Sequence, residues 1–181
     1  MLDIGAHIGK YTIAAAKSVG QEGRVIALEP DKKNYATLCK NVVLNNVENI
    51  FALNLAAWME EDSLVLQVGK TSGRHSVKRD LGLGHSAVRA VAIDGLVESN
   101  RMSRLDWVKV DVEGSETEAL TGMQQTLRVL RPRIILEVTT SNLDSIRSIL
   151  KIHEYQIIQI SPLNVANRVQ SSYFFAVPLG E

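Results

Sequence analysis

The residues of this chain that could do chemistry gather first around a glycine turn near its amino end. Residues 2–9 begin as an apolar strand that ends at Asp3 and turns at Gly5, and a helical pattern follows Gly9. Such a turn leaves unpaired backbone N–H groups at the start of the helix, and its glycines let a ligand come close. The turn therefore predicts a ligand-binding site.

A carboxylate, Glu29, ends the next apolar run, residues 24–28. It follows the glycines by about twenty residues, the separation at which an acidic side chain can bind the two hydroxyls of a ribose. Together the glycine turn and Glu29 indicate a cofactor that contains a nucleoside.

The charge at the turn favours one such cofactor. A dinucleotide site has the pattern G-x-G-x-x-G, whereas this chain has Asp3-x-Gly5-x-x-x-Gly9. The carboxylate of Asp3 would repel a pyrophosphate but attract an ammonium group. S-adenosylmethionine carries an ammonium group, a carboxylate and a ribose but no phosphate, so we expect it in preference to NAD.

Further carboxylates follow the later strands that the sequence predicts. Ligands of an open α/β sheet bind beyond the carboxyl ends of its strands, where Asp111, Glu113 and Glu137 are expected in addition to Asp3 and Glu29. Strand alternation places Asp111 and Glu113 on the same side. Because a row of carboxylates is costly to desolvate, we interpret it as functional. Hard cations bind such oxygen sets, so a divalent metal is possible here but is not predicted, and no His or Cys spacing suggests zinc.

Apolar runs alternate with helical patterns along the chain, which is typical of a parallel sheet covered by helices on both faces. The last two expected strands have only a short turn at 164–167 between them and must be antiparallel. We therefore expect a three-layer α/β sandwich, with a mostly parallel Rossmann-like sheet that ends in an antiparallel hairpin. The expected strands are 1–4, 24–29, 50–57, 105–112, 133–138, 155–160 and 170–177. The expected helices include 31–46 and 143–151. A further helix is expected to begin with a capping box of Ser115 and Glu118 and to be interrupted at Gly122.

An insertion interrupts this rhythm. Residues 63–68 and 87–93 alternate in polarity and predict a β-hairpin inserted between the third and fourth core strands. The glycine-rich, basic segment 69–86 between them is expected to be a mobile lid, in which His75 and His85 are second candidates for a catalytic base.

The composition is that of an ordinary globular domain, and we expect residues 1–181 to form one. Hydrophobic residues make up 45% and charged residues 22%. Twenty acidic and twenty basic side chains cancel, so no net field would attract nucleic acid or an anionic membrane. No apolar run is long enough to span a bilayer, and no signal-peptide pattern is present. We expect a cytoplasmic protein, and a homo-oligomer remains possible.

At this point the sequence resembles the FkbM family of S-adenosylmethionine-dependent methyltransferases. The most specific part of the resemblance is the Asp-Val-Glu-Gly-x-Glu segment from Asp111 to Glu116. The matching segments, in family order, are 2–9, 27–30, Asn41 with Asn45 and Asn46, 54–57, 108–116 and 132–137.

The resemblance implies a role for each matched residue. Asp3, Gly5 and Gly9 would hold the methionine end of the cofactor and Glu29 its ribose. The catalytic residues implied, facing the methyl acceptor, are Asp111, Glu113 and Glu137. The full set of cofactor contacts that it implies is Asp3, Gly5, Ala6, His7, Gly9, Glu29, Pro30, Ala56, Ala57 and Asp111. The implied reaction is O-methylation of a hydroxyl on a sugar, glycolipid or other small molecule, in which alignment and a nearby base lower the barrier.

The chain departs from the family pattern in two places. His7 stands where the family usually has Asn, and the chain begins at its first strand, without the preceding segment that normally covers the cofactor. A non-catalytic cofactor-binding module or partner subunit is therefore an alternative. An NAD-dependent oxidoreductase is disfavoured by the missing third glycine and by Asp3. Nucleic-acid methylation is disfavoured by the absence of an Asn/Asp-Pro-Pro-Tyr motif and by the zero net charge.

Overall fold

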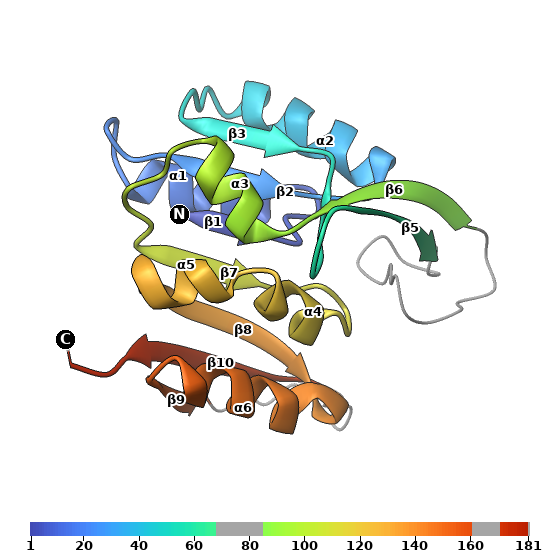
Figure 1. Cartoon of the computed structure of the whole chain (residues 1–181). Coiled ribbons are helices and arrows are strands. Elements are labelled where there is room, and N and C mark those ends of the chain that lie inside the picture. Colours follow the sequence, from blue (N-terminus) through green and yellow to red (C-terminus); the bar gives the residue numbers. More distant parts are fainter. Residues whose placement is uncertain (68–84, 161–170, 181) are drawn as a thin grey trace.

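Strands and helices alternate along most of the chain in its computed structural model, which describes residues 1–67, 85–160 and 171–180 (Figure 1). The elements are β1 (Leu2–Ile4), α1 (Lys10–Ser18), β2 (Val25–Leu28), α2 (Lys32–Leu44), β3 (Ile50–Leu53), β4 (Ala56–Ala57), β5 (Asp62–Gln67), β6 (His85–Val91), α3 (Ile93–Ser99), β7 (Trp107–Val110), α4 (Glu116–Thr121), α5 (Gln124–Val129), β8 (Arg133–Thr139), the 3-10 helix η1 (Thr140–Asn142), α6 (Leu143–Ile152), β9 (Tyr155–Ile160) and β10 (Ser171–Pro178).

The main sheet has seven strands in the order β3-β2-β1-β7-β8-β10-β9. In this order, each neighbouring pair among β3, β2, β1, β7 and β8 is parallel. Strand β10 is antiparallel to both β8 and β9. In this register Asp3 of β1 lies between Ala27 of β2 and Lys109 of β7. The predicted α/β fold with a mostly parallel sheet and a final antiparallel hairpin is confirmed, and the carboxyl ends of the parallel strands meet at one edge.

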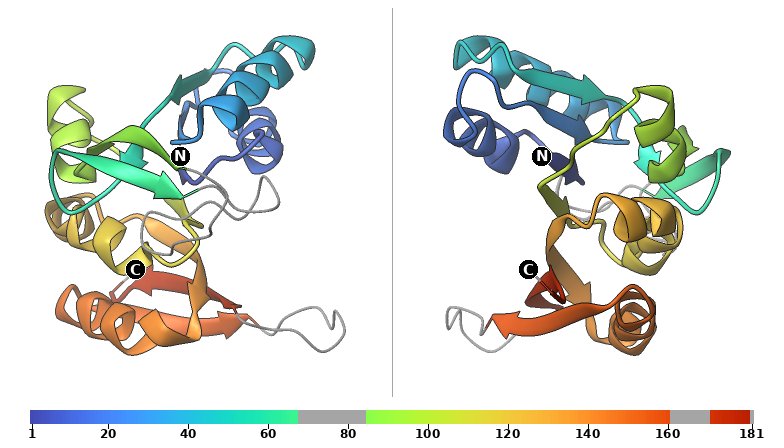
Figure 2. Two further views of the ribbon diagram at one scale, coloured as in Figure 1. Left: turned by 90° about the vertical axis from the view of Figure 1, so that its right-hand side faces the viewer. Right: turned by 60° about the vertical axis from the view of Figure 1, so that its left-hand side comes forward.

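The helices divide between the two faces of the main sheet. Helices α1 and α2 cover β1, β2 and β3 on one face, whereas α3, α4, α5 and α6 lie on the other (Figures 1 and 2). Within the described residues, no helix lies over β8, β10 and β9 on the α1 face (Figure 2). Nor is any helix in this part of the chain long and apolar enough to cross a membrane.

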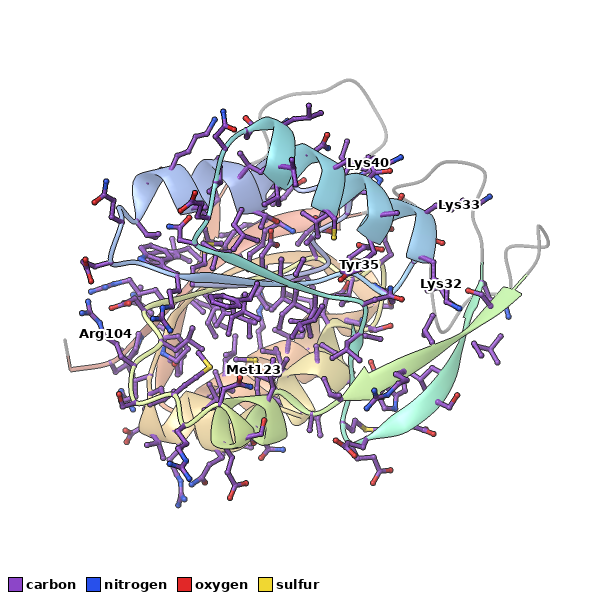
Figure 3. All side chains as sticks on the ribbon, turned by 90° about the horizontal axis from the view of Figure 1, so that it is seen from above. Lys32, Lys33, Tyr35, Lys40, Arg104 and Met123 are labelled. Atoms are coloured by element: carbon purple, nitrogen blue, oxygen red, sulfur yellow. The ribbon has the colours of Figure 1, made fainter. Side chains whose placement is uncertain are left out.

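The hydrophobic core fills the space between the sheet and the helices α3 to α6. Met123 lies at its centre, among the side chains beneath the sheet, and Arg104 points outward at the edge (Figure 3). Burial of this apolar surface stabilises the domain by roughly 25 cal/mol per Å². Strand alternation supplies the sheet side of the core, whose fully or almost fully buried members include Leu2, Ile4, Val108, Val110, Ile134, Leu136 and Phe174.

The predicted third strand, residues 50–57, is wrong as a single element. The ladder to β2 ends where Glu29 N–H donates to Leu53 O, and the chain then leaves the main sheet. The side chain of Asn54 fixes this departure, because its Nδ2 donates to the backbone oxygens of Glu29 and Pro30 at 2.8 and 2.9 Å. Strand β4 instead pairs with β6 in a separate three-stranded sheet, in which β5 and β6 form the predicted antiparallel hairpin.

Two further boundaries differ from the prediction. The expected strand 87–93 ends at Val91, and α3 begins at Ile93; this helix was missed because Gly95 interrupts its short pattern and Ala92 at its start offers no capping side chain. The expected strand 105–112 is shortened to β7, because the chain turns at Glu113 and Gly114 with φ of 50° and 105°. The expected lid at 69–86 lies outside the described residues except for residues 85 and 86, which belong to β6 and not to a loop. The expected turn at 164–167 also lies outside the described residues.

Candidate active site

The glycine turn after β1 is held against the ends of its two neighbouring strands. The backbone N–H groups of Gly5 and Ala6 both donate to Leu28 O at 3.0 Å. Gly5 has φ of +83°, and a Cβ there would lie 1.9 Å from the backbone oxygen of Asp111. A Cβ on Gly9, which begins α1 at φ of +90°, would lie 2.4 Å from Leu38 Cδ1. Both glycines are therefore required for close approach of the backbone.

A cleft of about 230 Å³ opens at this edge of the sheet. Of the cofactor and catalytic residues that the resemblance implies, Asp3 and Gly9 do not line it. Those that it brings together are Gly5, Ala6, His7, Glu29, Pro30, Ala56, Ala57, Asp111, Glu113 and Glu137.

Glu29 is held rigidly at one end of the cleft. Its Oε2 accepts the backbone N–H of His7 at 2.8 Å and its Oε1 accepts that of Asp31 at 2.9 Å. Burial raises the pKa of Glu29, and these hydrogen bonds act in the opposite direction. The side chain of Asn34 also forms a hydrogen bond with this carboxylate. Because an ionised carboxylate has about four acceptor positions, Glu29 retains capacity for a further donor such as a ribose hydroxyl.

Asp3 is fully buried behind the glycine turn. Thr12 Oγ1 donates to its Oδ2 at 2.6 Å, and Lys109 Nζ lies 3.5 Å from its Oδ1. Oδ2 thus accepts a hydrogen bond, whereas Oδ1 has an ion pair with Lys109 but no hydrogen-bond partner among the described residues. Its predicted contact with a cofactor ammonium stays a prediction, and in this structure Asp3 supports the cleft from behind.

Lys109 is a site residue that the sequence reasoning missed. Its Nζ lies 3.0 Å from Asp111 Oδ2 and 3.4 Å from Gly5 O, with the ring of Tyr11 5.3 Å away. The available signal was a lysine between two valines of a strand expected to be buried, two residues before a carboxylate.

The opposite end of the cleft combines a carboxylate with exposed aromatic rings. Glu137 of β8 lies directly across from Tyr173 of β10, whose hydroxyl donates a hydrogen bond to it. Burial, followed by this hydrogen bond, raises the pKa of Tyr173, so the phenol stays protonated. Tyr173 is 41% exposed, and Tyr11 is exposed at the same end. The sequence reasoning missed both tyrosines.

The turn between β7 and α4 contributes two carboxylates to the cleft. Both were predicted, but from alternation within a strand, which is not how the structure positions them. Asp111 and Glu113 line the cleft, although Glu113 lies in a left-handed turn after the strand has ended. The predicted capping box of Ser115 is wrong: with φ −108° and ψ 21° its side chain makes no capping hydrogen bond. Glu116 replaces it, accepting Gly114 N–H at 2.7 Å.

Glu116 also connects two helices. Its Oε2 accepts a hydrogen bond from Asn142 Nδ2 at 2.6 Å, at the start of α6. Burial raises the pKa of Glu116, whereas the hydrogen bonds from Gly114 and Asn142 lower it. Its role here is to fix the turn that carries Asp111 and Glu113. Among the described residues, no three His, Cys, Asp or Glu side chains are grouped so that they could hold a metal ion.

Comparison with known proteins agrees with this fold and shows the family of the chain. Residues 3–157 match the family described as the methyltransferase FkbM domain. The chain belongs to the FkbM methyltransferase domain family. The family match includes every strand-end carboxylate of the cleft, whereas Tyr173 lies beyond it.

The chain is similar to two curated methyltransferases. Methyltransferase 1 of Beauveria bassiana is 24% identical over 80% of this chain and 66% of that protein. The hexuronic acid methyltransferase AglP of Haloferax volcanii is 28% identical over 70% of this chain and 50% of that protein.

The structure of methyltransferase FkbM from Methylobacillus flagellatus superposes with a TM-score of 0.68 and 22% identity, covering 97% of this chain and 42% of that one. An O-methyltransferase from Bacillus cereus in complex with SAH has a TM-score of 0.60 and 16% identity, covering 98% and 72%. At these identities the structures establish the fold. The chain spans about half to two thirds of the length of the two curated relatives.

Proposed function

We propose that this chain is an S-adenosylmethionine-dependent O-methyltransferase domain that acts on a hydroxyl of a sugar, glycolipid or other small molecule. The observation that carries the proposal is one cleft with two chemically different ends. One end has the glycine turn and Glu29, which suit a nucleoside cofactor. The other has Asp111, Glu113 and Glu137, which suit a hydroxylated acceptor.

The residues of the cofactor end fit S-adenosylmethionine. Glu29 can accept a ribose hydroxyl, and the small side chains of Ala56 and Ala57 leave an apolar wall for the adenine. No phosphate-binding glycine follows the turn, which argues against a dinucleotide. The Bacillus cereus O-methyltransferase of the same fold, in complex with SAH, supports this choice.

The bound cofactor would supply an electrophilic methyl group on a sulfonium. The chain's own task is to align the acceptor oxygen with that methyl group and to remove a proton. A new O–CH₃ bond forms as the C–S bond breaks, and the hydroxyl proton passes to a carboxylate. Such a base contributes about 10²–10⁴-fold. Glu137, oriented by Tyr173, and Glu113 are the candidate bases, whereas Asp111 is already ion-paired with Lys109.

The acceptor class rests on two observations. Carboxylates beside exposed rings, here Tyr11 and Tyr173, suit a molecule with several hydroxyls and an apolar face. The relative AglP, named as a hexuronic acid methyltransferase, supports a sugar acceptor. Methyl transfer to a carbohydrate hydroxyl is therefore the reaction to test first.

Calorimetry with S-adenosylmethionine, S-adenosylhomocysteine and NAD tests the cofactor. We expect both sulfur nucleosides to bind and NAD not to bind; the reverse would favour an oxidoreductase. Transfer of labelled methyl to a panel of glycosides then tests the reaction. Cofactor binding with no transfer to any hydroxylated acceptor would favour the non-catalytic module.

A further inference from the structure

Lys109 has contacts with four segments at the cleft. Its side chain is only 10% exposed. The ammonium lies 3.5 Å from Asp3 Oδ1, 3.0 Å from Asp111 Oδ2 and 3.4 Å from Gly5 O. The ring of Tyr11, on α1, lies over it at 5.3 Å. These partners come from β1, the glycine turn, the end of β7 and the first turn of α1.

The charges in this cluster explain why a cation is needed. Asp3 lies within β1 and is fully buried, and Asp111 follows the adjacent parallel strand β7. Two carboxylates this close, without a counter-ion, would repel each other and lose solvation. Burial lowers the pKa of Lys109, but the charges of Asp3 and Asp111 outweigh burial and leave that pKa raised. The side chain therefore carries its charge throughout the neutral range.

The geometry of the turn depends on the same cluster. Asp111 N–H donates to Ile4 O at 3.0 Å, so the end of β7 lies directly beside the start of the glycine turn. The ammonium of Lys109 joins these two segments, because it contacts Gly5 O on one and Asp111 Oδ2 on the other. Movement of this ammonium would release both.

We infer that Lys109 is a positioning residue that holds the glycine turn and Asp111 in the arrangement that receives the amino-acid end of the cofactor. This inference rests on the proposed function, because it assigns a ligand to that end of the cleft. Glu29, which would hold the ribose, has hydrogen bonds to His7 and Asp31 and does not depend on Lys109.

Binding of two different ligands distinguishes an effect on the amino-acid end of the site from an effect on its nucleoside end. S-adenosylhomocysteine has both the nucleoside and the amino-acid end, whereas 5′-methylthioadenosine has the nucleoside alone. Lys109→Met should weaken S-adenosylhomocysteine roughly ten- to a hundredfold, the range expected when charge-assisted contacts are lost. The affinity for 5′-methylthioadenosine should remain within about twofold of the parent value.

A variant that keeps the positive charge at position 109 tests the inference even if Lys109→Met does not fold. Lys109→Arg keeps the cation but moves its charge, so it should fold, bind 5′-methylthioadenosine normally and bind S-adenosylhomocysteine more weakly than the parent. Adding Asp111→Asn to Lys109→Met should recover melting temperature, since one unpaired carboxylate is removed. Lys40→Met, at an exposed position on α2 that points away from the sheet (Figure 3), should change neither affinity.

The outcomes separate the inference from the proposed function. If the parent binds neither ligand, the proposed function is wrong. If the parent binds both and the Lys109 variants weaken the two ligands equally, or weaken neither, Lys109 is a structural residue and the inference is overturned. A selective loss of S-adenosylhomocysteine in Lys109→Arg would support it.

Discussion

The backbone N–H of His7 donates to Oε2 of Glu29 at 2.8 Å and so joins the glycine turn to the end of β2. His7 adopts a left-handed conformation, with φ of 52°, which aims this N–H at the carboxylate. The second oxygen of Glu29 is fixed by Asp31 N–H. A carboxylate held in this way is pre-organised, and ligand binding need not spend free energy on ordering it.

Glu29→Ala should therefore weaken cofactor binding strongly. Removing charge-assisted hydrogen bonds costs roughly 1.5–3 kcal/mol, or about ten- to a hundredfold in Kd, which calorimetry with S-adenosylhomocysteine would measure. Glu22→Ala, at an exposed position before β2, is the matched control and should leave the affinity unchanged. Equal affinity in the Glu29 variant and the parent would remove Glu29 from the site.

Cofactor affinity should fall in acid earlier than an exposed carboxyl group would predict. Burial raises the pKa of Glu29 above its ordinary value of 4.5, and the ionised form is the stronger acceptor for a ribose hydroxyl. For the free protein the sign is opposite: the raised pKa favours folding below pH 4.5, and that contribution is lost as pH rises through the folded pKa. Titration calorimetry between pH 7 and 4 should show this step in the parent and not in Glu29→Gln. A parent affinity that stays flat over this range would contradict the assignment.

Glu137→Gln should reduce methyl transfer while preserving the fold. The amide keeps the shape of the side chain but cannot accept a proton, so turnover should fall by about 10²–10⁴-fold. Melting temperature and S-adenosylhomocysteine affinity should match the parent, because Glu137 lies at the acceptor end. A variant that melts early yet methylates normally would make Glu137 a structural residue.

Tyr173→Phe should have a smaller effect on the same step. It removes the hydrogen bond that orients Glu137, worth roughly 1.5–3 kcal/mol when the acceptor is charged, and keeps the ring. We expect kcat to fall about tenfold or more, with cofactor affinity unchanged. The control is Tyr35→Phe, on α2 (Figure 3), whose hydroxyl contacts Ala52 O rather than the cleft. Equal kcat in the two variants would exclude a role for the Tyr173 hydroxyl.

Two glycine substitutions should act in opposite directions on stability. A Cβ on Gly122 would lie 1.9 Å from Trp58 O, so Gly122→Ala should destabilise the fold by about 1–3 kcal/mol. A Cβ on Gly95, inside α3, would meet nothing within 4 Å, and Gly95→Ala should stabilise the fold by about 0.5–1 kcal/mol. Denaturant midpoints would measure both; a stabilised Gly122→Ala would show that the contact between α4 and β4 is not close.

The strands and the carboxylates at their ends were predictable from the sequence because the signals are local. Alternating buried positions such as Val108 and Val110 define a strand, and a carboxylate after a strand marks the ligand edge of a parallel sheet. This strand pattern alone predicted that Glu29, Asp111 and Glu137 lie around one cleft.

Other parts of the site depend on which strands become neighbours, and the sequence pattern does not contain that information. Lys109 acquires its role only because β1 places Asp3 beside it. Tyr173 reaches Glu137 only because β10 lies next to β8. The wrong capping box at Ser115 has a similar origin, since Glu116 and Asn142 of a distant helix satisfy the turn instead.

The position of β10 between β8 and β9 also sets an order of events during synthesis. Residues 171–178 leave the ribosome after both of the strands that they join. Until then β8 has an unpaired edge, which is open to association with other nascent chains. Glu137 at that stage lacks the phenol that orients it. The domain therefore acquires its acceptor end only once β10 has been made, in the same step that pairs the edge of β8.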